Sequence, residues 1–369
     1  MAKAETEKTE KKAKVEISTL TGIPEIDAMM LSLSKDFGED MSGEDYGNLS
    51  FTTSGSTKFD CVTGRGGIPN GRIIELIGNT GSMKTSVALA WIAQRQAWRR
   101  AQGITDKRDV ILDLEHSLER SFIEGFGIDM SQVIWKRFHT SEEALQFLIQ
   151  LVKSGHIDYA LLDSVDAMQS ETQLRKAVGD DVVGGIAKIM NFSLRQLTKL
   201  APEFNSTLIF INQIKTNPMQ MFGSPKVTPG GAALGYYARL RIEAMNRKDG
   251  IPDLAGAALV RLKIIKTSFG PPIEDEIELA FKYGKGFDVV YDTESLAKDL
   301  DILSHSAGQT KVRWTTDSDP VPLLPDIEKG KEAGQRALRE NPQLVERLRH
   351  ACLRAYKVPT ARPDSDFTS

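Results

Sequence analysis

The stretch Ile73-Ile74-Glu75-Leu76-Ile77-Gly78-Asn79-Thr80-Gly81-Ser82-Met83-Lys84-Thr85 decides the fold class of this chain. An apolar run leads into a Gly-containing turn, and a helical pattern begins near Ser86, which is the context that a phosphate-binding loop requires. In the pattern G-x-x-x-x-G-K-[ST], backbone N–H groups and a helix N-terminus surround a phosphate while the lysine neutralises charge. Lys84 and Thr85 fit, but Met83 stands where the second glycine belongs. Met83 predicts either an ordinary backbone geometry or a small strain, and the motif alone leaves open an ordinary strand-to-helix turn.

Length and composition favour a soluble protein with one large α/β domain and smaller terminal additions. The chain has 369 residues, a net charge of −3, 26% charged residues and 40% hydrophobic residues. This length is ample for a buried core, and the charge balance gives no global sign of nucleic-acid binding. Any contact with DNA must therefore be local.

The cysteines and the N-terminus point to a cytoplasmic protein. Cys61 and Cys352 form neither a metal-ligand spacing nor a disulfide framework, so we expect free, buried thiols in a reducing compartment. No apolar run is long enough to span a bilayer, and the charged N-terminus lacks the apolar core of a signal peptide.

Residues 1–49 are predicted to form an N-terminal tail, a short amphipathic helix and a linker. Residues 1–16 carry mixed charge and few large apolar side chains, which is typical of a disordered or loosely helical tail. Apolar residues recur at helical spacing over 23–37, and 38–49 is polar and contains glycine. The helix could pack on its own domain or on a neighbouring subunit.

Residues 50–290 alternate short apolar strands with amphipathic helices. The expected strands are 73–77, 109–114, 158–163 and 207–212, and the expected helices lie near 85–101, 118–126, 142–154 and 184–200. This alternation predicts a mostly parallel central sheet flanked by helices, with ligands bound outside the carboxyl ends of the strands. Residues 257–290 are predicted to add antiparallel strands at the sheet edge.

The remaining residues form a smaller region. Residues 291–357 are predicted to be an α+β or helical C-terminal region, with two helices within 330–355 joined at Glu340-Asn341, where Asn341-Pro342 offers an N-cap and a first helical residue. Residues 358–369 are polar, and we expect a disordered tail.

Two carboxylates at strand ends complement the phosphate loop. Asp163 closes an apolar run, where a carboxylate can hold Mg²⁺ directly or through water. Glu115 ends another strand and could activate a water molecule. Each signal is weak alone, because an apolar run followed by Asp is common and Glu115 could simply be a solvated residue opening the next helix.

A third polar strand end leads into a long segment of mixed chemistry. Gln213 ends a buried strand where a γ-phosphate could be sensed, and residues 214–229 follow it. This segment combines lysines with apolar and glycine residues, which suits single-stranded nucleic acid, although a solvated surface loop stays possible. A second loop, 169–187, is not basic.

Together these residues resemble the RecA-type homologous-recombination ATPases, in a form like those of bacteria and their phages. The resemblance covers roughly residues 50–355 and lies in 64–75 before the phosphate loop, LDLEHSLE (112–119), LLDSVDAM (161–168), FINQI (210–214), MFGSP (221–225), PGGAALGYYA (229–238) and NPQLVERLR (341–349).

The resemblance implies a RecA-type ATPase core that uses ATP and Mg²⁺, forms filaments on single-stranded DNA and exchanges strands with a homologous duplex in recombination and repair. The implied partners are single-stranded and homologous double-stranded DNA, further copies of the chain, and single-strand-binding and mediator proteins, with no membrane. The location would be the cytoplasm, or the host cytoplasm if the protein is phage-encoded. The helix of 23–37 would be the polymerisation element.

The resemblance also implies roles for individual residues. Lys84, Glu115, Gln213 and Lys266 would be catalytic, with Glu115 activating water, Gln213 sensing the γ-phosphate and Lys266 reaching the nucleotide of a neighbouring subunit. Thr85 and Asp163 would hold the metal. The nucleotide site would comprise Gly78, Asn79, Thr80, Gly81, Ser82, Met83, Lys84, Thr85, Ser86, Glu119, Phe122 and Tyr283, with Phe122 on the adenine and Glu119 near its amino group. DNA would contact Val182, Val183, Arg195, Lys215, Met221, Phe222, Gly223, Lys226, Gly230 and Gly231.

Several positions depart from the family pattern. Met83 points to the phage-like branch, Ser268 replaces a second lysine near the subunit interface, and Lys226 replaces an acidic residue. The tail after Val358 is not a long acidic run, so self-inhibition by such a tail is not expected. Two alternatives stay open at this point: a DNA-binding regulator with little ATP turnover, and a ring-forming, helicase-like motor on the same core.

Overall fold

The computed structural model describes residues 49–175, 185–216, 226–251, 254–306, 309–312, 327–328 and 330–358. The expected helix of 23–37 lies outside the described residues. Within them, no helix is long and apolar enough to cross a bilayer.

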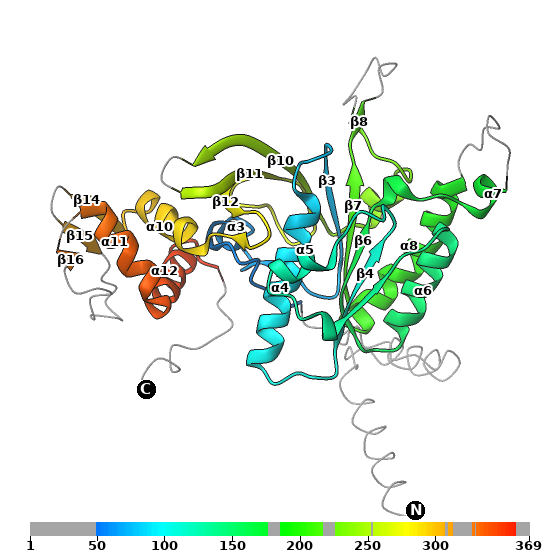
Figure 1. The fold of residues 1–369 in the computed structure, drawn as a ribbon, viewed down its shortest axis with the longest axis horizontal. Helices are drawn as coiled ribbons and strands as arrows, with labels where there is room; N and C mark the ends of the chain where they lie inside the picture. Colours follow the sequence, from blue (N-terminus) through cyan, green and yellow to red (C-terminus); the bar gives the residue numbers. More distant parts are fainter. Residues whose placement is uncertain are drawn as a thin grey trace, which may run out of the picture. The chain divides into compact units, whose positions relative to one another are not determined.

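A nine-stranded sheet forms the centre of the fold, in the order β13-β12-β11-β10-β3-β7-β6-β4-β5 (Figure 1). Its strands are β3 (Ile73–Gly78), β4 (Arg108–Asp113), β5 (Val133–Lys136), β6 (Ile157–Asp163), β7 (Thr207–Gln213), β10 (Leu240–Ile251), β11 (Leu254–Thr267), β12 (Glu276–Lys282) and β13 (Gly286–Phe287). The strands from β10 to β5 in this order pair in parallel, and β11, β12 and β13 continue the sheet antiparallel. The expected mostly parallel sheet with an antiparallel edge is confirmed.

Helices cover both faces of this sheet. The helices among the described residues are α3 (Thr57–Val62), α4 (Lys84–Ala101), α5 (Arg120–Gly125), α6 (Ser141–Lys153), α7 (Glu171–Leu174), α8 (Gly185–Glu203), α9 (Ala233–Tyr237), α10 (Val289–Asp299), α11 (Gly330–Glu340) and α12 (Pro342–Ala355), of which α11 and α12 belong to the C-terminal region and pack away from the sheet faces. Side chains alternate along each strand, so Leu161 packs with residues of α4 while its neighbour Leu162 packs with residues of α6 and α8. The two faces thereby bury separate apolar cores.

A buried ion network lies where β4 and β6 begin, away from the phosphate loop. Arg99 of α4 donates to Asp109 at 2.6 Å and to Asp158 at 3.0 Å, and Arg95 donates to Asp158 at 2.8 Å. All four side chains are almost fully buried. The network ties α4 to two strands, and the sequence pattern gave no sign of it because charged residues on a helix are ordinarily solvated.

The C-terminal region packs on the short helix α3. Arg349 of α12 donates to the fully buried carboxylate of Asp60 at 2.9 Å, and Ser56 donates to Asp292 of α10 at 2.7 Å. Cys61 and Cys352 are free and fully buried in the same apolar cluster, as expected.

Helices α11 and α12 meet at Glu340 and Asn341, as predicted. The side chain of Asn341 accepts from the backbone N–H of Leu344 at 3.2 Å, so it caps α12. Small strands accompany the helices: β1 (Phe51–Thr52) with β2 (Ile68–Pro69), and β14 (Leu303–Ser306), β15 (Gln309–Val312) and β16 (Ile327–Glu328).

Several boundary predictions were wrong. The segment 214–229 is not entirely loop, because β8 (Lys215–Thr216) pairs with β9 (Lys226–Val227) at its base. The segment 169–187 holds α7 and the first turn of α8. Val358, assigned to the tail, is 5% exposed because it packs in the apolar cluster of the C-terminal helices. Strand β10 was missed, since its sequence mixes charged and apolar residues.

Candidate nucleotide and DNA site

The phosphate loop joins β3 to α4, as predicted. A Cβ on Gly78 would lie 2.4 Å from the carbonyl oxygen of Ala244, so this position accepts only glycine. Met83 precedes the helix with φ +70° and ψ +18°, and no side chain caps the first N–H groups of α4. The expectation of an ordinary backbone at Met83 was wrong, and the alternative of local strain applies. The open N-terminus of this long helix is suited to an anion.

Lys84 bends back over the loop. Its Nζ donates to the carbonyl oxygens of Asn79 at 2.8 Å and Gly78 at 3.1 Å. Burial lowers the pKa of the Lys84 ammonium, and the nearby carboxylates of Asp163 and Glu115 oppose that shift. The lysine is thus a nearly buried cation beside the helix N-terminus, with only backbone and hydroxyl oxygens as its bonded partners.

Thr85 and Asp163 are hydrogen-bonded. The Thr85 Oγ1 donates to the Asp163 Oδ2 at 2.7 Å, and Asp163 is 2% exposed. Burial raises the pKa of Asp163 to about 7, with Glu115 and Asp113 adding to the rise. A buried carboxylate next to a hydroxyl is a hard oxygen pair that suits Mg²⁺. In the described part of the chain no three His, Cys, Asp or Glu side chains gather as a metal site. Thr85 and Asp163 therefore fit a cation whose remaining ligands include the oxygens of a bound phosphate.

Glu115 follows β4 and lies beside Asp163. The backbone N–H groups of Leu114 and Glu115 donate to the carbonyl oxygen of Asp163, at 2.7 and 3.2 Å. The hydroxyl of Ser164 donates to the Glu115 Oε1. Glu115 is exposed, so its other oxygen is free to meet a water molecule.

Gln213 ends β7 directly opposite Gly78 of β3. The Thr80 Oγ1 of the phosphate loop donates to its Oε1 at 3.4 Å. The phosphate loop follows β3, Gln213 ends β7, Asp163 ends β6 and Glu115 follows β4. These four strands, whose polar ends the sequence predicted, are consecutive in the sheet.

The residues expected around an adenine lie on α5 and after β12. Phe122 is half-buried, with its ring 5.3 Å from that of Phe126, and Glu119 is the exposed residue that precedes α5. Tyr283 is 57% exposed, and its hydroxyl accepts from Asn246, which also donates to the carbonyl of Gly81 at 3.3 Å. Ser86 is buried in the first turn of α4. The structure thus brings Tyr283 to the phosphate loop through Asn246.

Lys266 bonds within its own chain. Its Nζ donates to the carbonyl oxygens of Gly235 at 2.9 Å and Tyr236 at 2.6 Å. Burial and the nearby charges of Arg239 and Arg241 lower the pKa of its ammonium.

The described part of the expected DNA face is a hollow of about 390 Å³ between α8, the glycine pair and α9. Gly230 and Gly231 each have φ +79°, and a Cβ on Gly230 would lie 2.7 Å from Val165 Cγ1. Arg195 of α8 is exposed, and Lys215 forms an ion pair with Asp166 at 2.5 Å. Val182, Val183, Met221, Phe222 and Gly223 lie outside the described residues, and so does the side chain of Lys226.

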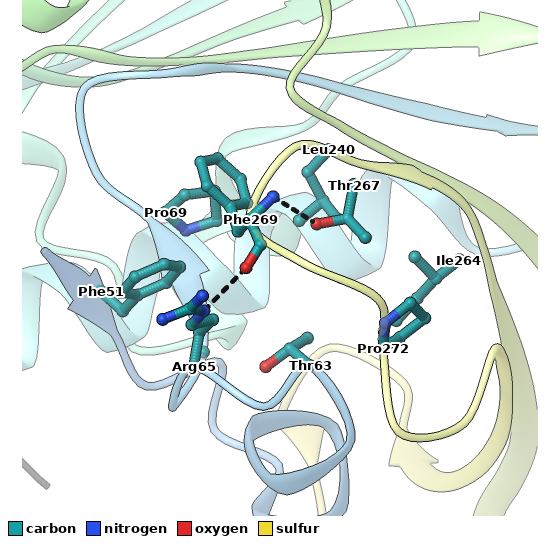
Figure 2. A pocket seen from close by; sticks show the side chains of 10 residues that line it. Phe51, Thr63, Arg65, Pro69, Leu240, Ile264, Thr267, Phe269 and Pro272 are labelled. Carbon is teal, nitrogen blue, oxygen red and sulfur yellow. Dashed lines mark hydrogen bonds between the residues drawn. The ribbon is translucent and has the colours of Figure 1, made fainter. Parts of the chain in front are cut away.

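A second hollow lies between the segment before the phosphate loop and the end of β11. Figure 2 shows Arg65 reaching the carbonyl oxygen of Phe269, at 2.8 Å, with Phe51, Pro69 and Pro272 around it. Its volume of about 10 Å³ holds about one water molecule. It is therefore too small for a nucleotide or a base.

Sequence reasoning missed the side chains that hold the site residues. Ser164 donates a hydrogen bond to Glu115, and Asn246 donates one to Tyr283. Arg241 donates one to Thr228, near the end of the 214–229 segment. Ser164 follows Asp163 directly, which was an available signal, whereas Asn246 and Arg241 lie on the unforeseen strand β10.

Comparison with known proteins identifies relatives along most of the chain. The RecA N-terminal domain family matches residues 25–288. Protein RecA of Deinococcus radiodurans is 32% identical over 368 residues, covering 95% of this chain and 94% of that protein. Protein RecA of Thermus aquaticus is 32% identical, covering 85% of this chain and 88% of that protein, and that of Corynebacterium pseudotuberculosis is 32% identical, covering 90% and 87%.

Proposed function

The chain belongs to the RecA family of recombinases, and from that premise we propose how its own residues perform DNA-dependent ATP hydrolysis. The family is one of DNA-dependent ATPases that act in recombination and repair. The observation that carries the assignment of roles is the gathering of Lys84, Thr85, Asp163, Glu115 and Gln213 at consecutive strand ends.

The phosphates bind at the N-terminus of α4. The uncapped N–H groups after Met83 surround the β-phosphate, and Lys84 exchanges its carbonyl partners for phosphate oxygens. This exchange is favourable because an ammonium bonded to charged oxygens gains more than one bonded to neutral carbonyls.

Thr85 and Asp163 would hold Mg²⁺ beside the bound nucleotide. When bound, Mg²⁺ neutralises charge that develops on the phosphate oxygens. Burial raises the pKa of Asp163, and a cation bound beside its carboxylate would favour the ionised form.

Glu115 activates water and Gln213 senses the γ-phosphate. The free oxygen of Glu115 accepts a proton from the attacking water, while Ser164 orients the carboxylate through its other oxygen. Gln213 gives up Thr80 and bonds to the γ-phosphate, which moves the end of β7 and the segment that follows it. Phe122, Glu119 and Tyr283 bind the base.

DNA binds at the hollow beside Gly230 and Gly231 and along 214–229. The glycines let the backbone approach phosphates closely, and Arg195 supplies positive charge. In a filament, Lys266 leaves the carbonyls of α9 for the nucleotide of the next subunit. Strand exchange follows from binding a homologous duplex beside the first strand, with single-strand-binding and mediator proteins as auxiliary partners.

Phosphate release with and without single-stranded DNA tests these roles. Lys84→Ala should abolish ATP-dependent DNA binding and hydrolysis, while Lys153→Ala, at the end of α6, should match the wild type. An unchanged Lys84→Ala variant would show that the phosphate loop is wrongly assigned. A strand-exchange assay with homologous and non-homologous duplex, with and without ATP, tests the full reaction.

A further inference from the structure

A buried carboxylate lies in the strand that leads into the phosphate loop. Glu75 of β3 is fully buried, and it accepts from Arg241 Nε at 2.6 Å and from Asn212 Nδ2 at 3.0 Å. Arg241 is the register partner of Glu75 on β10, and Lys266 is the register partner of Arg241 on β11. A fully buried side chain touches no bound ligand, so any role of Glu75 in the reaction is exerted through its neighbours.

Asn212 forms the first connection. Its Nδ2 bonds both Glu75 and the carbonyl oxygen of Pro229, at 3.1 Å, and its Oδ1 accepts from the backbone N–H of Gln213 at 3.0 Å. One amide side chain thereby joins the strand before the phosphate loop, the backbone of Gln213 and the last residue of the 214–229 segment. A shift of Gln213 acts on Pro229 through two hydrogen bonds.

Arg241 forms the second connection. While Nε holds Glu75, its Nη2 donates to Thr228 Oγ1 at 3.3 Å. Thr228 and Pro229 directly precede Gly230, whose backbone packs against Val165, two residues after Asp163. Both connections from Glu75 therefore reach the same end of the segment.

We propose that Glu75 is a positioning residue that couples the nucleotide site to the DNA-binding segment, by holding Asn212 and Arg241 on Pro229 and Thr228. The inference rests on the proposed roles of Gln213 and of the segment 214–229 with the adjoining Gly230 and Gly231. The buried carboxylate, held by two hydrogen bonds, transmits the position of Gln213 to Thr228 and Pro229. Binding at either site then biases the other, because coupling between two sites is reciprocal.

The charges of Glu75, Arg241 and Lys266, which are register partners on β3, β10 and β11, explain why the acid is needed. With Glu75 neutral, Arg241 and Lys266 lie side by side on paired strands without the carboxylate that Arg241 bonds. Repulsion and the loss of a buried ion pair would free Arg241 from Thr228. Thr228 would then no longer follow the position of Gln213.

Glu75→Gln tests the proposal in the full chain. The readouts are ATP turnover with and without single-stranded DNA, the KM for ATP, and the salt midpoint of DNA binding with and without ATP. We expect DNA stimulation of turnover to fall by about tenfold, in the range of typical coupling between sites. The ATP-induced shift of the salt midpoint should shrink with it, while basal turnover and the KM for ATP stay near wild type.

Asp158→Asn is the matched control, because it also removes a buried, arginine-bonded carboxylate on this sheet but lies in the network at the start of β6. It should lower the melting temperature while leaving DNA stimulation unchanged. A merely structural Glu75 would behave in the same way, and a folded Glu75→Gln protein with wild-type stimulation would overturn the proposal.

Two milder variants decide the question if Glu75→Gln does not fold. Thr228→Val removes the hydroxyl that accepts from Arg241, and Arg241→Lys keeps the charge but loses the separate nitrogen, Nη2, that reaches Thr228. Both should lose several-fold of the stimulation, and wild-type stimulation in both would overturn the coupling role. A wild-type protein that DNA does not stimulate would instead contradict the proposed residue roles, whatever the variants do.

Discussion

Thr85 and Asp163 are hydrogen-bonded across the carboxyl end of the sheet, with 2.7 Å between Oγ1 and Oδ2. Thr85 lies in the first turn of the helix after β3, and Asp163 ends β6, with β7 between the two strands. The backbone thus holds the two proposed oxygen ligands together, so we expect Mg²⁺ binding to cost little conformational entropy.

Asp163→Asn should lower Mg²⁺-dependent ATP turnover by about 100-fold, because an amide oxygen is a weaker ligand than a carboxylate and cannot balance the cation charge. Turnover measured against Mg²⁺ concentration checks this. Thr85→Ser keeps the hydroxyl and should retain most activity, whereas Thr85→Ala should not. Equal dependence of turnover on Mg²⁺ concentration in Asp163→Asn and the wild type would show that Asp163 does not hold the metal.

Glu115→Gln should keep ATP binding and lose hydrolysis by about 100- to 10,000-fold, the usual range for a general base. Fluorescent-nucleotide binding and phosphate release measure the two effects separately. Glu124→Gln, on the exposed side of α5, is the matched control and should be silent. Turnover near wild type in Glu115→Gln would mean that another group activates the water.

The core of the site was predictable because its signals are local. An apolar run followed by a polar residue marks a buried strand and its end, and parallel strands bring those ends to one edge. For this reason Asp163, Glu115 and Gln213 could be placed beside Lys84 from the sequence.

The supporting contacts could not be predicted, because each depends on register between distant strands. Glu75 and Arg241 are partners only because β10 pairs with β3, and the mixed charges of β10 hid it as a strand. The same holds for Arg99 with Asp109 and Asp158, since nothing local tells a buried ion pair from solvated charges.

Asp292→Asn should change the pH dependence of stability. Burial raises the pKa of Asp292 from 3.8 to about 6, even though Ser56 and the N–H of Lys58 donate to it. Between these values the folded protein binds more protons than the unfolded chain, so the free energy of unfolding falls as pH rises from about 4 to 6.

The variant lacks this titration. Relative to wild type it should gain on the order of 2–3 kcal/mol between pH 4 and pH 7, at about 1.4 kcal/mol per pKa unit. Urea unfolding across this range measures the difference, with exposed Asp106→Asn as the control. A constant difference between variant and wild type would show that Asp292 titrates normally.

Met83 brings a backbone cost and a packing gain, and two variants separate them. Its left-handed backbone, φ +70°, costs a residue with a Cβ about 1–2 kcal/mol, while its side chain is 6% exposed in the apolar core. Deleting a buried methionine side chain costs about 2–5 kcal/mol, so Met83→Gly should be destabilised overall despite the relieved backbone. Met83→Ala loses nearly the same packing but keeps the Cβ and with it the backbone strain, so it should be less stable than Met83→Gly. The difference should be up to about 1 kcal/mol, because the greater unfolded-state entropy of glycine offsets part of the relieved strain. Thermal and urea unfolding give this order, and an alanine variant more stable than the glycine variant would mean that the loop stores no strain at Met83.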